Sequence, residues 1–146
     1  MSAKSISERT PRGQGQLILV VEDAPMVRHL AKISLRFHGY EVITAQDGGQ
    51  GLAAFARHRD SIRAVLTDTL MPVMDGVQMT RAIRELDPQM AIISASGCPD
   101  PEVTAAYEAL KVTAFLHKPY RQSELLSILA TVMQRKPAPG YAAPRP

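Results

Sequence analysis

The stretch Ala64-Val-Leu-Thr-Asp68-Thr-Leu-Met-Pro72 decides the fold of this chain, because an apolar run in it ends abruptly at a carboxylate. Four to five apolar or β-branched residues between breakers are typical of a buried strand. Asp68 would then stand at the end of a sheet, with its carboxylate facing an open crevice. Taken alone, the stretch also fits an aspartate that caps a helix or a turn, so the rest of the chain must decide between the two interpretations.

Four other apolar runs have the same character and alternate with segments of helical periodicity. The further strands are predicted over residues 17–21, 41–45, 91–95 and 113–116. The helices are predicted over 25–38, from Asp47 onward, over 76–86, from Pro101 onward and over 122–135. Near-continuous apolar strands alternating with helices predict an α/β fold, a doubly wound parallel sheet of five strands with five helices on its two faces.

The helical segments also predict which side chains pack on the sheet. In the first helix, one face at helical spacing contains Val27, Leu30, Ala31, Ser34 and Phe37. In the later helices the predicted core positions are Leu52, Phe55 and Ala56, then Met79, Ile83 and Leu86, then Val103, Ala106, Tyr107 and Leu110, and finally Leu125, Leu126, Leu129 and Val132.

Composition limits the class of protein. A length of 146 residues corresponds to about one domain. Cys98 is the only cysteine, so a disulfide within the chain is excluded, and this suits a reducing cytoplasm. No window approaches 18 apolar residues and the first 16 residues lack an apolar signal region, so we expect neither a membrane span nor secretion.

The net charge of +3 belongs largely to the two ends of the chain. Residues 17–136 contain 13 basic and 13 acidic side chains, so a basic face for direct DNA binding is not indicated. Residues 1–15 are polar with glycine and proline, and residues 137–146 are rich in proline. We therefore expect an N-terminal tail over 1–15, one folded domain over 16–136 and a C-terminal tail over 137–146.

Reactive side chains end four of the predicted strands: Glu22 and Asp23, Asp68, Ser96, and Lys118. Ligands bind to open parallel sheets at the carboxyl ends of the strands. Two carboxylates 4 Å apart repel by roughly 4 kcal/mol at an effective dielectric near 20, so three of them require cations. Lys118 supplies one positive charge, and an all-oxygen cluster with room for water favours Mg²⁺. A carboxylate beside a divalent metal and a lysine suits phosphoryl chemistry.

Four motifs together resemble the receiver domain of two-component response regulators: Val20-Val-Glu-Asp-Ala-Pro25, Leu66 to Gly76, Ile93 to Gly97 and Phe115-Leu-His-Lys-Pro119. The resemblance covers residues 17–135. It implies a CheY-like, flavodoxin-like sheet with strand order 2-1-3-4-5. It also implies phosphotransfer to Asp68 from a histidine kinase or a histidine phosphotransfer protein, in a two-component system or a phosphorelay.

The resemblance further implies roles for single residues. Asp68 would accept the phosphoryl group, and Lys118 would bind it. Glu22, Asp23, Asp68 and the backbone carbonyl of Leu70 would hold Mg²⁺. Ser96 would bond a phosphoryl oxygen and Phe115 would follow it by changing rotamer, which would alter a target-binding face formed by the helix after Pro101, the strand over 113–116 and the last helix. Leu70 and Cys98 would border the path of the hydrolytic water, and the Lys118-Pro119 bond would be cis.

Less specific interpretations exist for each motif. Glu22 and Asp23 also fit a helix-capping pair, Phe115 fits a core residue, and Lys118 fits a solvated lysine. Ser94 competes with Ser96, since the two share a strand face.

Two other classes of protein are also considered. Gly49-Gln-Gly51-Leu-Ala-Ala54 matches a dinucleotide-binding pattern. It follows an outer strand, however, and leaves Glu22, Ser96 and Lys118 unused. An aspartate phosphatase normally has a second carboxylate where Leu70 stands. A receiver is therefore expected to be a regulatory module, not an enzyme with turnover. A stand-alone regulator, a relay shuttle and a receiver detached from a hybrid kinase all remain open.

Overall fold

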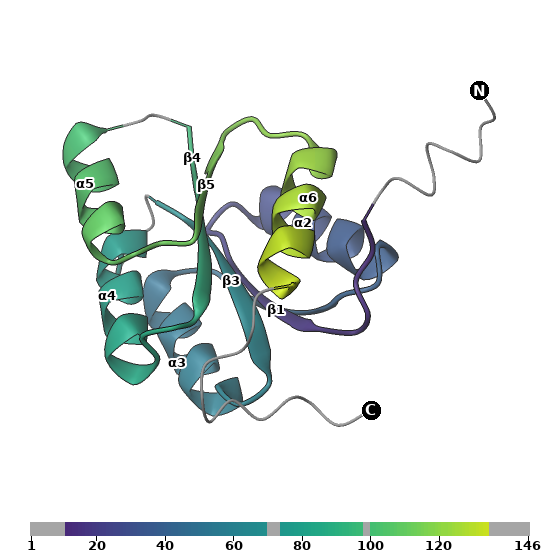
Figure 1. Ribbon diagram of the computed structural model, residues 1–146, viewed down its shortest axis with the longest axis horizontal. Coiled ribbons are helices and arrows are strands. Elements are labelled where there is room, and N and C mark those ends of the chain that lie inside the picture. The colour runs from purple at the N-terminus through teal and green to yellow at the C-terminus, as the bar shows by residue number, and fades with distance from the viewer. Residues whose placement is uncertain (1–10, 70–73, 98–99, 135–146) are drawn as a thin grey trace.

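The computed structural model describes residues 11–69, 74–97 and 100–134. Strands and helices alternate along the whole described chain (Figure 1). In chain order the elements are β1 (Leu17–Val21), α2 (Pro25–Phe37), β2 (Glu41–Ala45), α3 (Gly48–His58), β3 (Ile62–Asp68), α4 (Gly76–Leu86), β4 (Ala91–Ser96), α5 (Pro101–Ala109), β5 (Ala114–His117) and α6 (Gln122–Met133).

The five strands form one parallel sheet in the order β2-β1-β3-β4-β5, which confirms the predicted fold class and strand order. Helices α2 and α6 lie on one face of the sheet, and α3, α4 and α5 lie on the other (Figure 1). Strand β3 is central, so Asp68 ends the middle strand, while β2 lies at an edge as predicted. None of the described helices combines the length and apolar character that crossing a bilayer requires.

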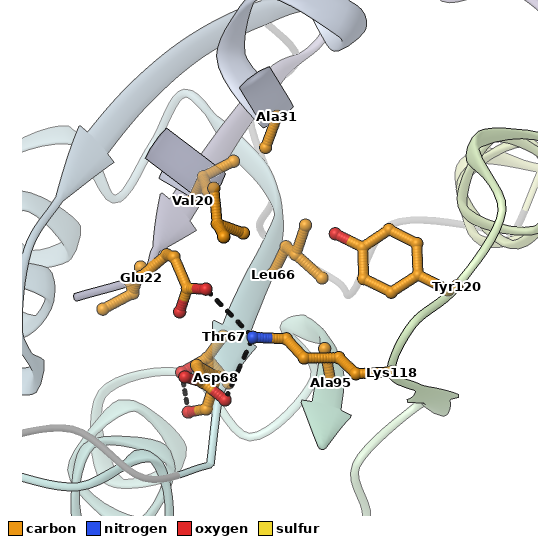
Figure 2. A pocket seen from close by; sticks show the side chains of 11 residues that line it. Val20, Glu22, Ala31, Leu66, Thr67, Asp68, Ala95, Lys118 and Tyr120 are labelled. Carbon is orange, nitrogen blue, oxygen red and sulfur yellow. Dashed lines mark hydrogen bonds and ion pairs between the residues drawn. The ribbon is translucent and has the colours of Figure 1, made fainter. Parts of the chain in front are cut away.

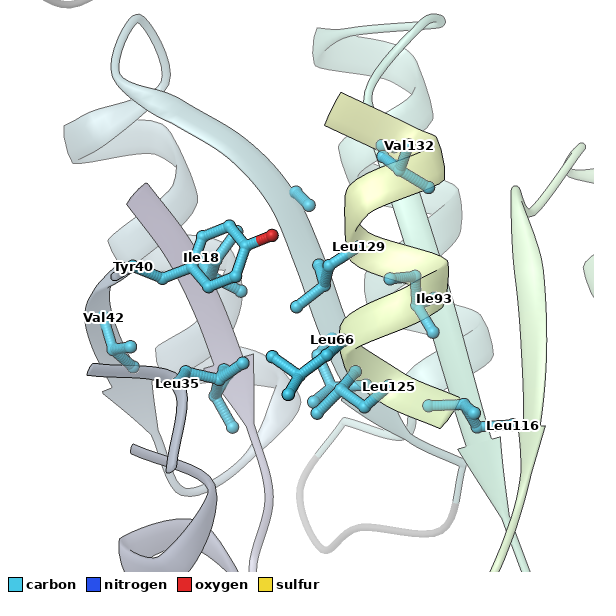
Figure 3. Close-up of a cluster of buried hydrophobic side chains, with 14 of the residues drawn as sticks. Ile18, Leu35, Tyr40, Val42, Leu66, Ile93, Leu116, Leu125, Leu129 and Val132 are labelled. Atoms are coloured by element: carbon cyan, nitrogen blue, oxygen red, sulfur yellow. The ribbon is translucent and has the colours of Figure 1, made fainter. Parts of the chain in front are cut away.

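Two apolar clusters, one on each face of the sheet, hold the layers together. On the α6 side, Leu125, Leu126, Leu129 and Val132 are buried against strand residues such as Ile18, as the helical spacing predicted (Figure 3). The other cluster joins Phe55 of α3 and Met79 and Ile83 of α4 to the remaining strand face. Both faces of β1, β3 and β4 are thereby covered, which explains their uninterrupted apolar sequences.

The predicted buried face of α2 is wrong. Leu35 is fully buried and Ala31 packs beside it, whereas Val27, Leu30 and Phe37 are 40%, 57% and 72% exposed. The helix has apolar residues on two faces, and periodicity alone does not say which one meets the sheet. Two smaller corrections have the same cause, since Ala56 is exposed and Leu86 is 37% exposed.

Local signals at the element ends agree well with the structure. The side chain of Asp47 accepts a hydrogen bond from the Gln50 backbone and caps α3. Gly39, which follows α2, has a φ of +94°, a conformation that glycine adopts without strain. The Lys118-Pro119 bond is cis, as expected. Strand β3 begins two residues earlier than the quoted stretch, and β5 lies one residue later than predicted.

Candidate functional site

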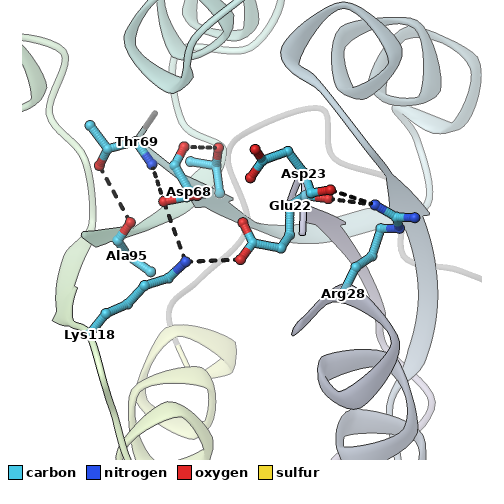
Figure 4. A network of polar contacts seen from close by, with 8 residues as sticks. Glu22, Asp23, Arg28, Asp68, Thr69, Ala95 and Lys118 are labelled. Atoms are coloured by element: carbon cyan, nitrogen blue, oxygen red, sulfur yellow. Dashed lines mark hydrogen bonds and ion pairs between the residues drawn. The ribbon is translucent and has the colours of Figure 1, made fainter. Parts of the chain in front are cut away.

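Three carboxylates converge at the carboxyl ends of β1 and β3 (Figure 4). Glu22 and Asp23 directly follow β1, and Asp68 is the last residue of β3. One carboxylate oxygen of each lies within 4.8 Å of the other two. Because β1 and β3 are hydrogen-bonded neighbours, the strand-end arrangement predicted from the sequence is confirmed.

The ammonium group of Lys118 joins this cluster from the far edge of the sheet (Figure 2). Its Nζ lies 2.9 Å from Glu22 Oε1 and 3.5 Å from Asp68 Oδ1. Lys118 follows β5, which is separated from β3 by β4, so its side chain extends back across the sheet end to reach the carboxylates. It is therefore not the solvated surface lysine of the alternative interpretation.

Backbone groups and a neighbouring arginine fix the positions of these side chains. The Thr69 backbone N–H donates to Asp68 Oδ1 at 2.8 Å, and the Thr67 hydroxyl donates to the Asp68 carbonyl oxygen at 2.9 Å. Arg28 of α2 donates to the carbonyl oxygens of Glu22 and Asp23 (Figure 4). The sequence reasoning did not single out Arg28. The signal in the sequence that could have identified Arg28 is its position one turn into the helix that follows Glu22 and Asp23.

The cluster contains more negative than positive charge. Burial, with further contributions from the hydrogen bond and charge of Asp68, raises the pKa of Glu22 to about 7 despite the opposing ion pair with Lys118. Burial disfavours the charged form of Lys118, but its contacts with Glu22 and Asp68 outweigh burial and raise its pKa. Glu22 Oε2 is buried without a hydrogen-bond partner among the described residues. One ammonium group therefore does not balance three carboxylates, and the donor set fits a hard divalent cation such as Mg²⁺.

Ser96 and Phe115 both line a cavity of about 200 Å³ between α5 and β5, which Thr69, the residue after Asp68, also borders. Ser96 ends β4 and is partly exposed, and Phe115 is 47% exposed. Ser94, the competing hydroxyl, is 1% exposed, and its oxygen lies 3.4 Å from the Thr69 hydroxyl. Of the two hydroxyl side chains, that of Ser96 is therefore the more accessible. Leu70 and Cys98, to which the sequence assigned a metal-ligand and a water-path role, lie outside the described residues.

Gly51 of the dinucleotide-like pattern has a packing role. A β-carbon on Gly51 would lie 2.7 Å from the sulfur of Met79 and 2.8 Å from a methyl group of Val21, so glycine allows α3 to approach the sheet and α4. The carboxylate of Asp47 occupies the N-terminus of α3, where a pyrophosphate would have to bind. Since α3 also follows the edge strand β2, the geometry does not support dinucleotide binding.

Comparisons with known proteins agree with this geometry. The response regulator receiver domain family model matches residues 18–130. The response regulator MprA of Mycobacterium sp. (strain KMS) is 32% identical over 118 residues, which are 81% of this chain and 50% of that protein. The peroxide stress-activated histidine kinase mak3 of Schizosaccharomyces pombe is 30% identical over 128 residues, 84% of this chain and 6% of the kinase. This chain therefore spans half or less of the length of these two relatives.

A solved structure of the chemotaxis protein CheY4 of Vibrio cholerae superimposes with a TM-score of 0.75 at 30% identity, covering 81% of this chain and 98% of that one. The family model matches residues 18–130, which are most of the chain, and the superposition with the solved structure covers 81% of it. The chain belongs to the response regulator receiver domain family.

Proposed function

We propose that Asp68 accepts a phosphoryl group from a phosphohistidine of a histidine kinase or histidine phosphotransfer protein, with Mg²⁺ held by Glu22, Asp23 and Asp68. The observation that carries this proposal is the meeting of three carboxylates and one ammonium group at the end of the central strand. Bound Mg²⁺ would neutralise charge on the carboxylates and on the transferred group. The domain is thus a regulatory module that promotes its own phosphorylation.

The side chains divide the chemistry between them. Asp68 Oδ1 is held by the Thr69 N–H and by Lys118, which leaves Oδ2 as the oxygen that we assign to attack on phosphorus. The phosphorus–nitrogen bond of the donor breaks as the new acyl phosphate bond forms, and the electron pair returns to the imidazole. Lys118 then pairs with a phosphoryl oxygen. Positioning and charge neutralisation account for most of what a protein contributes to such a transfer.

The signal would leave the site through Ser96 and Phe115. Ser96 lines the cavity that also borders Phe115, so a hydroxyl drawn toward the phosphoryl group makes room for the half-exposed ring to move inward. This movement would reshape the face formed by α5, β5 and α6, where we propose that the target protein binds. Ser96→Ala should therefore accept phosphate and yet show little change in amide exchange around Phe115.

The exposed apolar stripe of α2 supports a docking site for the phosphodonor. Met26, Leu30, Ile33 and Phe37 are 51–72% exposed and follow the four-three-four spacing of a helix-pairing seam. Residues 25–37 contain three basic side chains, Arg28, Lys32 and Arg36, and no acidic one, so a second copy of this helix would be repelled. An amphipathic helix with acidic residues beside its apolar seam fits best, and docked along α2 it would lie next to the strand ends.

A substitution at Asp68 tests the phosphoacceptor. Asp68→Asn should incorporate no phosphate from acetyl phosphate in the presence of Mg²⁺, measured by intact mass spectrometry, because the nucleophilic carboxylate is removed. Asp47→Asn is the matched control, since asparagine also caps a helix, and it should be labelled like the native chain. Labelling of Asp68→Asn, or labelling of the native chain in excess EDTA, would overturn the proposal.

The docking site has a separate test. Leu30→Glu places a charge in the middle of the α2 stripe and should slow phosphotransfer from a phosphorylated histidine phosphotransfer protein, while labelling by acetyl phosphate stays unchanged. Ala53→Glu, on the exposed side of α3, should affect neither reaction. Equal protein-to-protein transfer by the Leu30→Glu variant and the native chain would refute docking on α2.

A further inference from the structure

Helix α5 buries a single side chain against the domain. Tyr107 is the only buried residue of the helix and is 1% exposed. At the C-terminal end, Arg84 of α4 donates to the carbonyl oxygens of Leu110 and Lys111. Tyr107 is therefore the side chain through which the body of α5 packs most deeply on the domain.

The hydroxyl of Tyr107 extends from α5 to the backbone of the phosphoacceptor. A β-carbon on Gly76, the first residue of α4, would lie 2.3 Å from this hydroxyl and 2.4 Å from the Asp68 carbonyl oxygen. Both atoms therefore border the same small space, which only glycine at position 76 leaves open. The Gly76 N–H in turn donates to the Thr69 carbonyl oxygen at 3.0 Å. The Tyr107 hydroxyl thus lies against Gly76, whose backbone is hydrogen-bonded to the residue after Asp68.

This hydroxyl is buried without a hydrogen-bond partner among the described residues. Burial raises the pKa of Tyr107, and the hydroxyls of Ser94 and Thr69 are close enough to oppose this shift, but neither has the distance and angles of a formed hydrogen bond. Thr69 Oγ1 instead makes two long contacts, of 3.4 Å each, to Ser94 Oγ and to the Ala95 carbonyl oxygen. A buried donor without a partner is unfavourable, and long hydrogen bonds are easily exchanged. A small shift of Thr69 or Ser94 would therefore give Tyr107 the partner that it lacks.

The ring of Tyr107 also contacts Phe115, the aromatic residue that we propose changes rotamer on phosphorylation. The centroids of Tyr107 and Phe115 are 6.1 Å apart with an interplanar angle of 76°, an edge-to-face contact. Both rings border the cavity that Ser96 also lines. One side chain thus contacts the phosphoacceptor segment at its polar end and Phe115 at its ring.

We propose that Tyr107 is a positioning residue of the switch, which couples the backbone after Asp68 to Phe115 and α5. When a phosphoryl group on Asp68 shifts Thr69, Ser94 or the start of α4, the Tyr107 hydroxyl gains a hydrogen bond and the ring carries Phe115 and α5 into the second arrangement. This inference rests on the proposed function, because it assumes that Asp68 is the phosphoacceptor. It assigns to Tyr107 a role separate from those of Ser96 and Phe115.

The test compares Tyr107→Phe with Tyr40→Phe, which removes a hydroxyl from a buried tyrosine in the cluster on the α6 side of the sheet. Beryllofluoride with Mg²⁺ serves as the phosphoryl mimic, and hydrogen exchange over residues 101–117 reports the switch. We expect Tyr107→Phe to take up phosphate from acetyl phosphate like the native chain. Its beryllofluoride affinity should fall about fivefold, the factor for one net hydrogen bond, because coupling between sites is reciprocal. Its exchange response should shrink, while Tyr40→Phe should match the native chain.

Thr69→Val provides a second measurement. In a double-mutant cycle, Thr69→Val and Tyr107→Phe should have non-additive effects on beryllofluoride affinity. If beryllofluoride changed hydrogen exchange in Tyr107→Phe as much as in the native chain, Tyr107 would be an ordinary core residue, and the inference would be overturned. If Tyr107→Phe failed to take up phosphate while the native chain and Tyr40→Phe did so, the inference would also be overturned. Tyr107 would then be needed for the phosphorylation of Asp68 and not for the response to it. Absence of uptake in the native chain would instead refute the proposed function.

Discussion

Protons should compete with Mg²⁺ at Glu22. In the metal-free protein the pKa of this carboxyl group is about 7, raised by burial and by its interaction with Asp68. Mg²⁺ requires the ionised form, so its binding must release the proton. The ionised fraction of a group with this pKa falls from about nine-tenths at pH 8 to about one-tenth at pH 6. The apparent Mg²⁺ affinity should therefore fall about tenfold over this range.

The comparison that isolates this effect uses Glu22→Gln, which keeps the size of the side chain but does not titrate. Its Mg²⁺ affinity should be weaker at pH 8 and nearly constant down to pH 6. Glu41→Gln, at an exposed position on the edge strand β2, should behave like the native chain. Calorimetric titration suits the measurement because the chain contains no tryptophan. A native affinity that is constant from pH 6 to pH 8, or a Glu22→Gln variant that retains the tenfold change, would refute the reasoning.

The same pKa shift makes a prediction for folding in the absence of metal. Between the ordinary pKa of 4.5 and the folded pKa of about 7, the folded chain binds more protons at Glu22 than the unfolded chain does. The contribution of Glu22 to stability is therefore full below pH 4.5 and is lost as the pH rises through 7. The shift corresponds to at most about 3 kcal/mol, reduced by solvent screening at the open rim. Urea unfolding of the native chain relative to Glu22→Gln should show this loss, and a constant difference between them would contradict it.

Three further predictions concern single residues. Lys111 has a φ of +57°, so Lys111→Gly should raise the free energy of unfolding by about 1 kcal/mol in urea titrations, and a lowered value would show that the lysine is not strained. Arg84 donates to four carbonyl oxygens, so Arg84→Met should lower the unfolding free energy by about 1–3 kcal/mol, whereas exposed Arg81→Met should change it little. The family resemblance predicts that Leu70, whose side chain has no polar group, borders the path of the hydrolytic water, so Leu70→Asn should speed loss of phosphate from Asp68 about fivefold after donor removal, and equal or slower decay would refute this.

Topology explains why much of the site could be predicted from the sequence. Parallel strands place their carboxyl ends at one rim of the sheet. Once the strands are located in the sequence, Glu22, Asp68 and Lys118 are therefore predicted to lie close together. The distance of 2.9 Å between Lys118 and Glu22 bears this out. The same rule placed Ser96 beside them. These residues lie at the ends of regular elements, where local sequence and global fold agree.

Side chains whose environment depends on packing could not be predicted in this way. The apolar periodicity of α2 indicated a buried face but not which face, and Leu35 rather than Leu30 proved to be buried. The contacts of Arg28 with two carbonyl oxygens depend on how the loop after β1 turns. Tyr107 was recognised only as a helix residue at core spacing, because the position of its hydroxyl depends on the approach of α4 to α5.

The ion pair between Glu22 and Lys118 joins residues 96 positions apart in the chain. It forms only after β5, the last strand to emerge during synthesis, has paired with β4. A chain folded as far as β4 already brings the acidic groups together, but it has no ammonium group to hold a phosphoryl group beside them. Competence to receive a signal therefore arises at the final step of assembly. By the same reasoning, local unfolding of β5 and α6 would remove Lys118 from the site and prevent phosphorylation while the other four strands remain folded.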